Sequence, residues 1–162
     1  MSQPVETPLL LKMETVQLPE VDEFVLTEEV LKKANVGYVG DNFKRLFFGI
    51  REENVGAGTI ITHRLERNSL DAPILAELGD KARIHLAHFF GLLIKQSNGQ
   101  SGFLLTDEGA NIAYIIGNDG NFWVVCARWG PYNYNWAVFT ESSVGDMDVW
   151  AAGDQIFSCD SY

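Results

Sequence analysis

The sequence has few residues that react with substrates or bind metals, with only two cysteines and three histidines among 162 residues. Cys126 and Cys159 do not form a CxxC spacing, so the pattern indicates neither a zinc site nor a disulfide framework. We therefore expect two reduced thiols, with Cys126 in the core. No apolar run approaches the roughly 18 residues of a membrane span. The first residues also lack the basic start and apolar stretch of a secretory signal, so we expect a cytoplasmic protein that does not bind membranes.

Motifs for nucleophilic catalysis and for phosphate binding are missing as well. The sequence has no GxSxG, and Gly56-x-Gly58 lacks the following residues of a phosphate-binding loop. The adjacent acids Asp107 and Glu108 are typical of a turn. These absences favour a protein that is not an enzyme and that needs no cofactor.

Positive charge is scarce at both ends of the chain. The net charge is −10; residues 1–29 hold seven acids against Lys12, and residues 100–162 hold eight acids against Arg128. Such a surface repels the phosphates of DNA and RNA, so we expect no nucleic-acid partner. Solubility alone can account for the charge, and the oligomeric state is left open.

Alternating apolar residues predict an antiparallel β-meander in the last third of the chain. Its strands are Asn111 to Ile116, Phe122 to Trp129 and Trp136 to Thr140, with a short closing strand at Gln155 to Ser158. Asp119-Gly120 between the first two is a strong hairpin signal, because both residues tolerate positive φ. Earlier strands are expected at residues 45–50 and 59–65, with a loop over residues 51–58.

Two helical segments are predicted before the meander. Thr27 is a suitable N-cap for a short helix over residues 28–35. A stripe with helical spacing then predicts a helical segment over about residues 71–96, packed on the sheet; its members are Leu75, Leu78, Ala82, Leu86, Phe89 and Leu93. Gly79-Asp80 leaves open one long helix or two helices meeting at a bend, and a strand over residues 84–94 is the competing interpretation.

The first 26 residues read differently from the rest. Three prolines and scattered acids indicate an extended acidic arm, with Leu9 to Leu11 docking on the domain or on a partner. Residues 27–162 are then a single α+β domain, an antiparallel sheet of five to seven strands covered by the helical segment.

The tract from about Leu86 to Ser158 resembles a module of uncharacterised bacterial proteins. The matching pieces are Gln96-Ser97-Asn98-Gly99, Leu104-Leu105-Thr106, Ala110-Asn111-Ile112-Ala113-Tyr114, Phe122-Trp123-Val124-Val125, Trp136-Ala137-Val138, Ser143-Val144 and the ending Trp150-Ala151-Ala152-Gly153-Asp154-Gln155-Ile156-Phe157-Ser158. This ending follows W-x-A-G-x-x-[VI]-F-S. The module has no assigned activity, so the resemblance implies a compact fold and transfers no catalytic residue.

Aromatic residues around the predicted loop at residues 130–135 are the first candidate binding site. Tyr132 and Tyr134 stand among glycine, proline and asparagine, and Trp129 precedes them. Tyrosine and tryptophan are enriched where partners dock. The preferred hypothesis is therefore a non-enzymatic binding or accessory module whose partner, a protein or a small ligand, contacts these residues or the arm.

The histidines are the second candidate site. His85 and His88 are three residues apart on a predicted helix, and His63 lies on a predicted strand. Three imidazoles can hold a catalytic zinc with one open position. The alternative hypothesis is thus a metal-dependent or small-ligand enzyme using these three residues. The spacing H-x-x-H alone is a weak pattern, and we favour the interpretation that His85 and His88 lie on the solvent-facing side of the helix.

Overall fold

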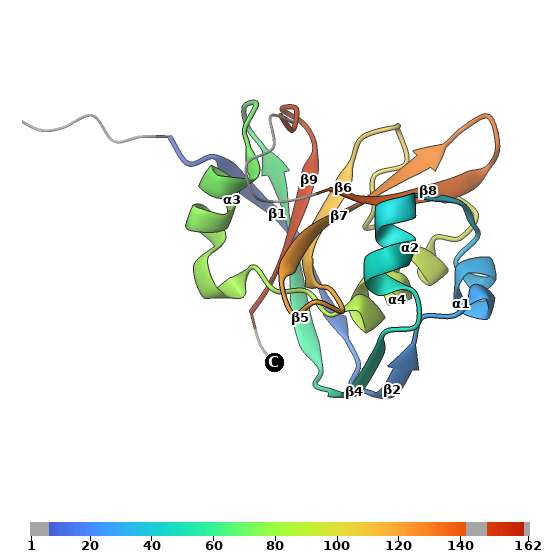
Figure 1. Cartoon of the computed structure of the whole chain (residues 1–162). Coiled ribbons are helices and arrows are strands. Elements are labelled where there is room, and N and C mark those ends of the chain that lie inside the picture. The colour runs from blue at the N-terminus through green and yellow to red at the C-terminus, as the bar shows by residue number, and fades with distance from the viewer. Residues whose placement is uncertain (1–6, 142–148, 161–162) are drawn as a thin grey trace, which may run out of the picture.

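The computed structural model describes residues 7–141 and 149–160 (Figure 1). Its strands in chain order are β1 Leu10–Leu18, β2 Val21–Val25, β3 Val36–Val39, β4 Arg51–Val55, β5 Gly58–Leu65, β6 Asn111–Ile116, β7 Phe122–Gly130, β8 Asn135–Glu141 and β9 Gln155–Cys159. Its helices are α1 Glu28–Lys33, α2 Asp41–Phe47, α3 Asp71–Leu78, the 3-10 turn η1 Gly79–Lys81, and α4 Leu86–Lys95. The chain is thus a mixed α/β fold.

Seven strands form the main sheet, in the order β1-β5-β9-β6-β7-β8-β3. The segment from β6 to β8 runs antiparallel, and Gly120 takes a φ of 80° in the β6–β7 turn. However, β9 pairs with β6 in parallel, and β3 pairs with β8 in parallel. The sheet is therefore mixed and mostly antiparallel instead of the purely antiparallel meander that the sequence suggested.

The segment around α2 differs most from the sequence prediction. Residues 45–50 were expected as a strand and residues 51–58 as a loop, but residues 45–47 form the end of α2 and residues 51–55 form β4. Phe43, Leu46 and Phe47 are all buried, and their spacing of three and four residues matches one face of a helix. Packing of this face outweighs the β propensity of Phe47 and Phe48, the two phenylalanines within residues 45–50. The partner of β4 is β2, in a separate two-stranded sheet.

The first described residues contribute strands to both sheets. β1 pairs antiparallel with β5 along its length, apart from a bulge between Lys12 and Thr15. Of the leucines expected to dock on the domain or on a partner, Leu9 is buried, whereas Leu11 is exposed. Residues 7–26 therefore pair with the rest of the fold, which local composition does not reveal. Residues 1–6, also assigned to the arm, lie outside the described residues.

The helical segment expected on one face of the sheet is divided between two faces. Residues of α3 pack in a cluster with Leu65, Tyr114 and Ile156, whereas residues of α4 pack with Ala113, Ile115 and Phe157. Successive strand residues point to opposite faces, so these are the two sides of the sheet. Of the two alternatives left open, two separate helices are observed: α3 ends at Leu78, before Gly79 with its φ of 63°, and α4 begins at Leu86. The residues of the expected stripe therefore do not share one face.

The link between α3 and α4 passes beside the sheet. Arg83 forms a bridge with Tyr114 on β6, and the Ile84 amide donates to the Tyr114 carbonyl at 3.0 Å. The next helix, α4, then lies in the larger cluster with residues of α2 and with Phe24 of β2. None of the helices in residues 7–141 and 149–160 is long and apolar enough to cross a membrane.

Candidate functional site

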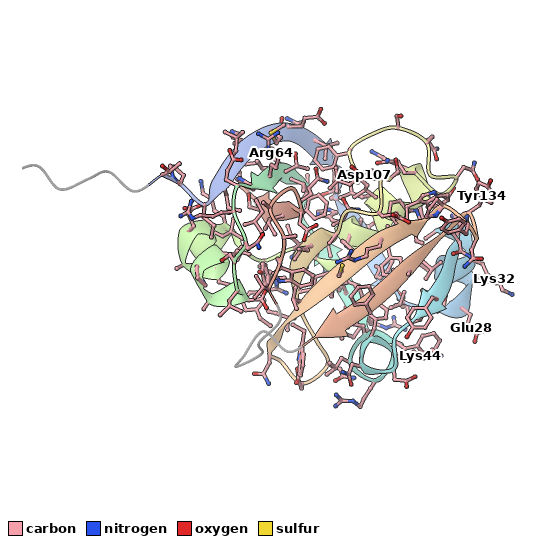
Figure 2. All side chains as sticks on the ribbon, turned by 90° about the horizontal axis from the view of Figure 1, so that it is seen from above. Glu28, Lys32, Lys44, Arg64, Asp107 and Tyr134 are labelled. Atoms are coloured by element: carbon pink, nitrogen blue, oxygen red, sulfur yellow. The ribbon has the colours of Figure 1, made fainter. Side chains whose placement is uncertain are left out.

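The β7–β8 hairpin presents the tyrosines that the sequence singled out. We call its connection, residues 130–135, the tyrosine hairpin. The side chains of Tyr132 and Tyr134 are 89% and 73% exposed. Figure 2 shows Tyr134 at the end of the molecule where α1 carries Glu28 and Lys32. Both tyrosines are therefore accessible to a partner.

Asn35, the residue after the α1 C-cap, holds the tyrosine hairpin in place. Its side-chain Nδ2 donates to the Ser97 carbonyl at 2.7 Å and to the Tyr134 carbonyl at 2.8 Å. Its own carbonyl accepts from the Trp136 amide at 2.9 Å. Asn35 and Tyr134 both have left-handed φ, 59° and 54°, a region that asparagine tolerates better than most residues. The hairpin is thus tied to two other parts of the chain.

Trp129 lies near the end of β7, next to the tyrosine hairpin, and its side chain is mostly buried. Its side chain is only 6% exposed and meets the ring of Trp136 edge-on, with centroids 5.3 Å apart. The Trp136 indole donates to the Gln96 carbonyl at 3.0 Å. Alternation along β7 turns Trp129 toward the larger core cluster, next to Val125 and Ala127. Trp129, named with the two tyrosines as a candidate binding residue, is thus mostly buried, and it can meet a partner only through the cavity that it lines beside Tyr132.

Gly99 permits this packing, which leads to a first prediction. Its φ is 67°, and a methyl group at this position would collide with the Trp129 indole. Gly99→Ala should lower the free energy of unfolding by about 2 kcal/mol, through backbone strain and overpacking together. Chemical denaturation measures it. Gly120→Ala is the matched control, because Gly120 has a similar φ of 80° with open space around it. An equal loss in both variants would contradict the proposed collision.

A cavity of about 400 Å³ opens beside Tyr132. Its wall includes Glu108 and Arg128 together with Trp129 and Pro131. The Arg128 guanidinium donates to the Glu108 carbonyl at 3.2 Å. The site therefore combines an apolar wall with one acidic and one basic side chain, an arrangement suited to receiving a side chain of a partner.

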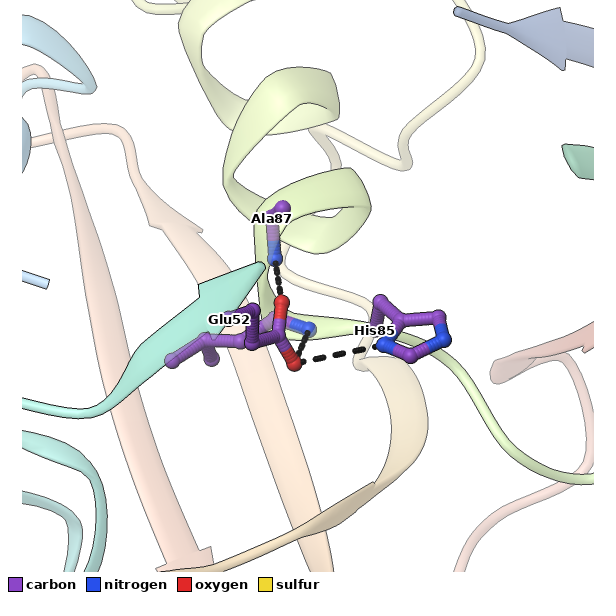
Figure 3. A network of polar contacts seen from close by, with 4 residues as sticks. Glu52, His85 and Ala87 are labelled. Atoms are coloured by element: carbon purple, nitrogen blue, oxygen red, sulfur yellow. Dashed lines mark hydrogen bonds and ion pairs between the residues drawn. The ribbon is translucent and has the colours of Figure 1, made fainter. Parts of the chain in front are cut away.

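His85 is placed by Glu52 at the start of α4 (Figure 3). The Glu52 carboxylate accepts from the backbone amides of Leu86 at 3.0 Å and Ala87 at 2.8 Å, and it lies 3.4 Å from His85 Nδ1. These contacts satisfy amides that a helix N-terminus otherwise leaves without partners. Glu52 thus acts as a cap contributed by a neighbouring strand.

His88 is buried, so the expectation that it lies on the solvent-facing side of its helix was wrong. Its side chain is 2% exposed, and Nε2 lies 3.1 Å from the Pro19 carbonyl. Burial lowers the pKa of His88 below its ordinary value of 6.5, although the bond to Pro19 acts in the opposite direction. The imidazole is therefore neutral, and its Nε2 donates to this carbonyl. His88 therefore connects α4 to the turn between β1 and β2.

His63 lies in a different environment from the other two histidines. It is on β5, and its Nε2 is 2.8 Å from the hydroxyl of Ser158 on β9. The residues that influence its charge are Lys12, Glu77 and Asp160, whereas His88 responds to His85 and Glu52. In the part of the chain that the structure describes, no three His, Cys, Asp or Glu side chains gather as metal ligands would. The three histidines are therefore not brought together.

The surroundings of His63 were missed by sequence reasoning. They form two adjoining cavities of about 490 and 220 Å³, both lined by Lys12, His63, Glu77 and Leu78. These residues come from β1, β5 and α3, so no contiguous motif marks them. Only the register of β5 against β9 brings Ser158 close to His63.

Comparison of the chain with protein-family models, with curated proteins and with solved structures finds no match.

Proposed function

We propose that this protein is a binding module whose contact surface is the tyrosine hairpin and whose partner is another protein. The observation that carries the proposal is the 89% and 73% exposure of Tyr132 and Tyr134 on a hairpin fastened by Asn35. Large aromatic side chains are usually at least half covered in a folded chain, so two neighbouring exposed ones favour a surface that is covered on binding.

The anchored backbone strengthens this proposal. A loop that is already ordered loses little conformational freedom on binding, and tyrosine has only two side-chain torsions to fix. The Tyr134 amide donates to the Gly130 carbonyl at 2.9 Å, which closes the turn from within. The binding free energy that the two rings contribute is therefore not reduced by a cost of ordering the hairpin.

The cavity beside Tyr132 favours a protein partner with a protruding side chain. Hot-spot residues of protein interfaces typically fill such pockets, surrounded by polar groups at the rim. Glu108 and Arg128 provide that rim here. With a net charge of −10, the protein would also associate faster with a partner of positive charge.

A photo-crosslinking experiment tests the proposal. para-Benzoylphenylalanine replaces Tyr132 in one variant and Phe48, a 45% exposed residue after α2, in another. In lysate of the source organism, the probe at position 132 should form one dominant adduct that the probe at position 48 does not form. Mass spectrometry identifies the partner, which is then purified.

Titration of the purified partner gives the quantitative prediction. Tyr132→Ala should weaken binding by about 30-fold, near 2 kcal/mol, because a central tyrosine is lost. Phe48→Ala, the matched control, should leave the Kd unchanged. The proposal fails if both probes give the same adducts, or if Tyr132→Ala with Tyr134→Ala binds the partner as tightly as the natural chain.

A further inference from the structure

The cavities around His63 lie far from the tyrosine hairpin. Figure 1 places β1, β5 and α3 at one side of the molecule and the β7–β8 hairpin at the other. Lys12, His63, Glu77 and Leu78 line both cavities, and Ser158 and Asp160 line the smaller one. We call these cavities together the Ser158 cleft. Its residues are independent of the proposed protein-binding surface.

Strand register places a hydroxyl and an imidazole in contact on the floor of the Ser158 cleft. His63 pairs with Ile156 and Ile61 pairs with Ser158, so His63 and Ser158 are diagonal neighbours on one face. Their Nε2 and Oγ atoms are 2.8 Å apart. A serine and a histidine within hydrogen-bonding distance are the arrangement in which the imidazole can take the hydroxyl proton.

Burial, helped by the charge of Lys12, keeps His63 in the form that accepts a proton. Burial lowers its pKa below 6.5, and the charge of Lys12 on β1 lowers it further, while Glu77 of α3 and Asp160 act in the opposite direction. Lys81 of η1 also lines the cleft but is paired with Asp160 at 3.0 Å. The imidazole is therefore neutral at pH 7 and can serve as a base.

The cleft also offers positive charge beside this pair. Glu77 is held by the backbone, accepting from the amides of Leu9 and Leu10 at 2.8 Å each. Lys12 has no ion-pair partner among the described residues, and Arg67, which donates to the Pro8 carbonyl at 3.3 Å, also lines the larger cavity. An anionic group on a ligand can therefore approach Lys12 and Arg67 while its other end reaches Ser158.

We propose that Ser158 is a nucleophile and His63 its general base, in a site that hydrolyses small carboxylic esters carrying an anionic group. Ser158 itself is only 2% exposed, but it lines the smaller cavity together with His63 and Lys12, so a ligand in that cavity can contact the pair and the cation beside it. Lys12, which pairs with His63 across β1 and β5, supplies positive charge near the oxyanion that forms during attack.

The chemical steps balance without any other reactant than water. Ser158 Oγ bonds to the carbonyl carbon as its proton passes to His63 Nε2, and the alcohol then leaves with that proton. Water, deprotonated by His63, attacks the acylated serine, and Oγ regains a proton as the acid is released. One ester and one water give one acid and one alcohol.

Labelling of the full chain with an alkyl fluorophosphonate tests the nucleophile. The serine oxygen bonds to phosphorus, and fluoride leaves together with the proton taken up by His63. Peptide mass spectrometry should find one label per chain, on Ser158. A chain that stays unlabelled, or that is labelled on another residue, overturns the proposal.

His63→Gln tests the base, because glutamine can still hydrogen-bond to Ser158 but cannot take its proton. Labelling should slow by about 100-fold, a usual contribution of general-base catalysis. Ser101→Ala, at an exposed serine, should label at the natural rate. Circular dichroism confirms that each variant is folded. Equal rates in His63→Gln and the natural chain would overturn the assignment of the base.

Ester hydrolysis tests the substrate class. para-Nitrophenyl hemisuccinate, which carries a carboxylate, should be hydrolysed with a kcat/KM about 10-fold higher than para-nitrophenyl acetate, and Lys12→Gln should remove this preference. A preference for the uncharged ester, or hydrolysis that persists in Ser158→Ala, contradicts the proposed substrate and site.

Discussion

Replacing Asp71 with alanine is expected to lower the free energy of unfolding by about 4 kcal/mol. Asp71 is buried in the first turn of α3, where its Oδ1 accepts from the Tyr114 hydroxyl at 2.7 Å and from the Trp150 indole at 2.8 Å. Each buried donor left without an acceptor costs ~1–3 kcal/mol, and alanine leaves both in that state. The expected loss is therefore large for a single side chain.

The contacts of Asp71 join three parts of the chain that are far apart in sequence. Tyr114 lies on β6, and Trp150 lies before β9 and pairs with Ser69. Burial, and then the charge of Asp71, raise the pKa of Tyr114 far above its ordinary value of 10.0, so the phenol remains the donor at any accessible pH. Asp71 therefore acts as a fixed acceptor between helix and sheet.

Denaturant titration followed by circular dichroism measures this loss. Asp80→Ala is the matched control, because Asp80 is exposed in η1 and its removal should change stability by less than ~0.5 kcal/mol. Tyr114→Phe removes one of the two bonds and should cost about 1 kcal/mol. If Asp71→Ala were no less stable than Asp80→Ala, the buried network would not contribute to folding.

The elements predicted correctly are those whose signal is local. Alternation along β6, β7 and β8, the turn at Gly120 and the Thr27 cap of α1 each depend on residues within a few positions. The strand β1 depends instead on its pairing with β5, about 50 residues away. The helices α3 and α4 lie on opposite faces of the sheet because the chain between them passes along β6. Neither is visible in a local pattern.

The candidate sites divide in the same way. The exposure of Tyr132 and Tyr134 follows from a turn rich in glycine, proline and asparagine, and composition alone indicates it. Burial of Trp129 depends on Gly99, and the contact of His63 with Ser158 depends on the register of two distant strands. The type of a residue and of its neighbours in the sequence cannot specify such long-range contacts.

Replacing Glu52 with glutamine is expected to lower the free energy of unfolding by about 3 kcal/mol at pH 7. The two carboxylate oxygens each accept one backbone amide of α4, whereas glutamine would direct an NH₂ group at one of them. Hydrogen bonds to a charged acceptor contribute ~1.5–3 kcal/mol, and the helix dipole adds ~0.3–1 kcal/mol. The helix concerned, α4, fills the larger core, so its start affects the whole fold.

The same contacts make the loss depend on pH. Burial raises the pKa of Glu52, but hydrogen bonds from His85, Ala87 and Leu86 together lower it more, so the net pKa is below the ordinary 4.5. A carboxyl with a lowered pKa in the folded state stabilises the fold fully above pH 4.5, and this stabilisation is lost as the pH falls through the folded-state value. The difference between the natural chain and Glu52→Gln should therefore shrink in acid.

Glu53→Gln is the matched control for both measurements. Glu53 is the next residue on β4, is exposed, and lies 3.8 Å from the Arg51 guanidinium, an exposed ion pair of little energetic value. Its replacement should change stability by less than ~0.5 kcal/mol across the same pH range. If the stability difference for Glu52→Gln stayed constant down to pH 3, the carboxylate charge would not be the source of the stabilisation, and the cap would act through shape alone.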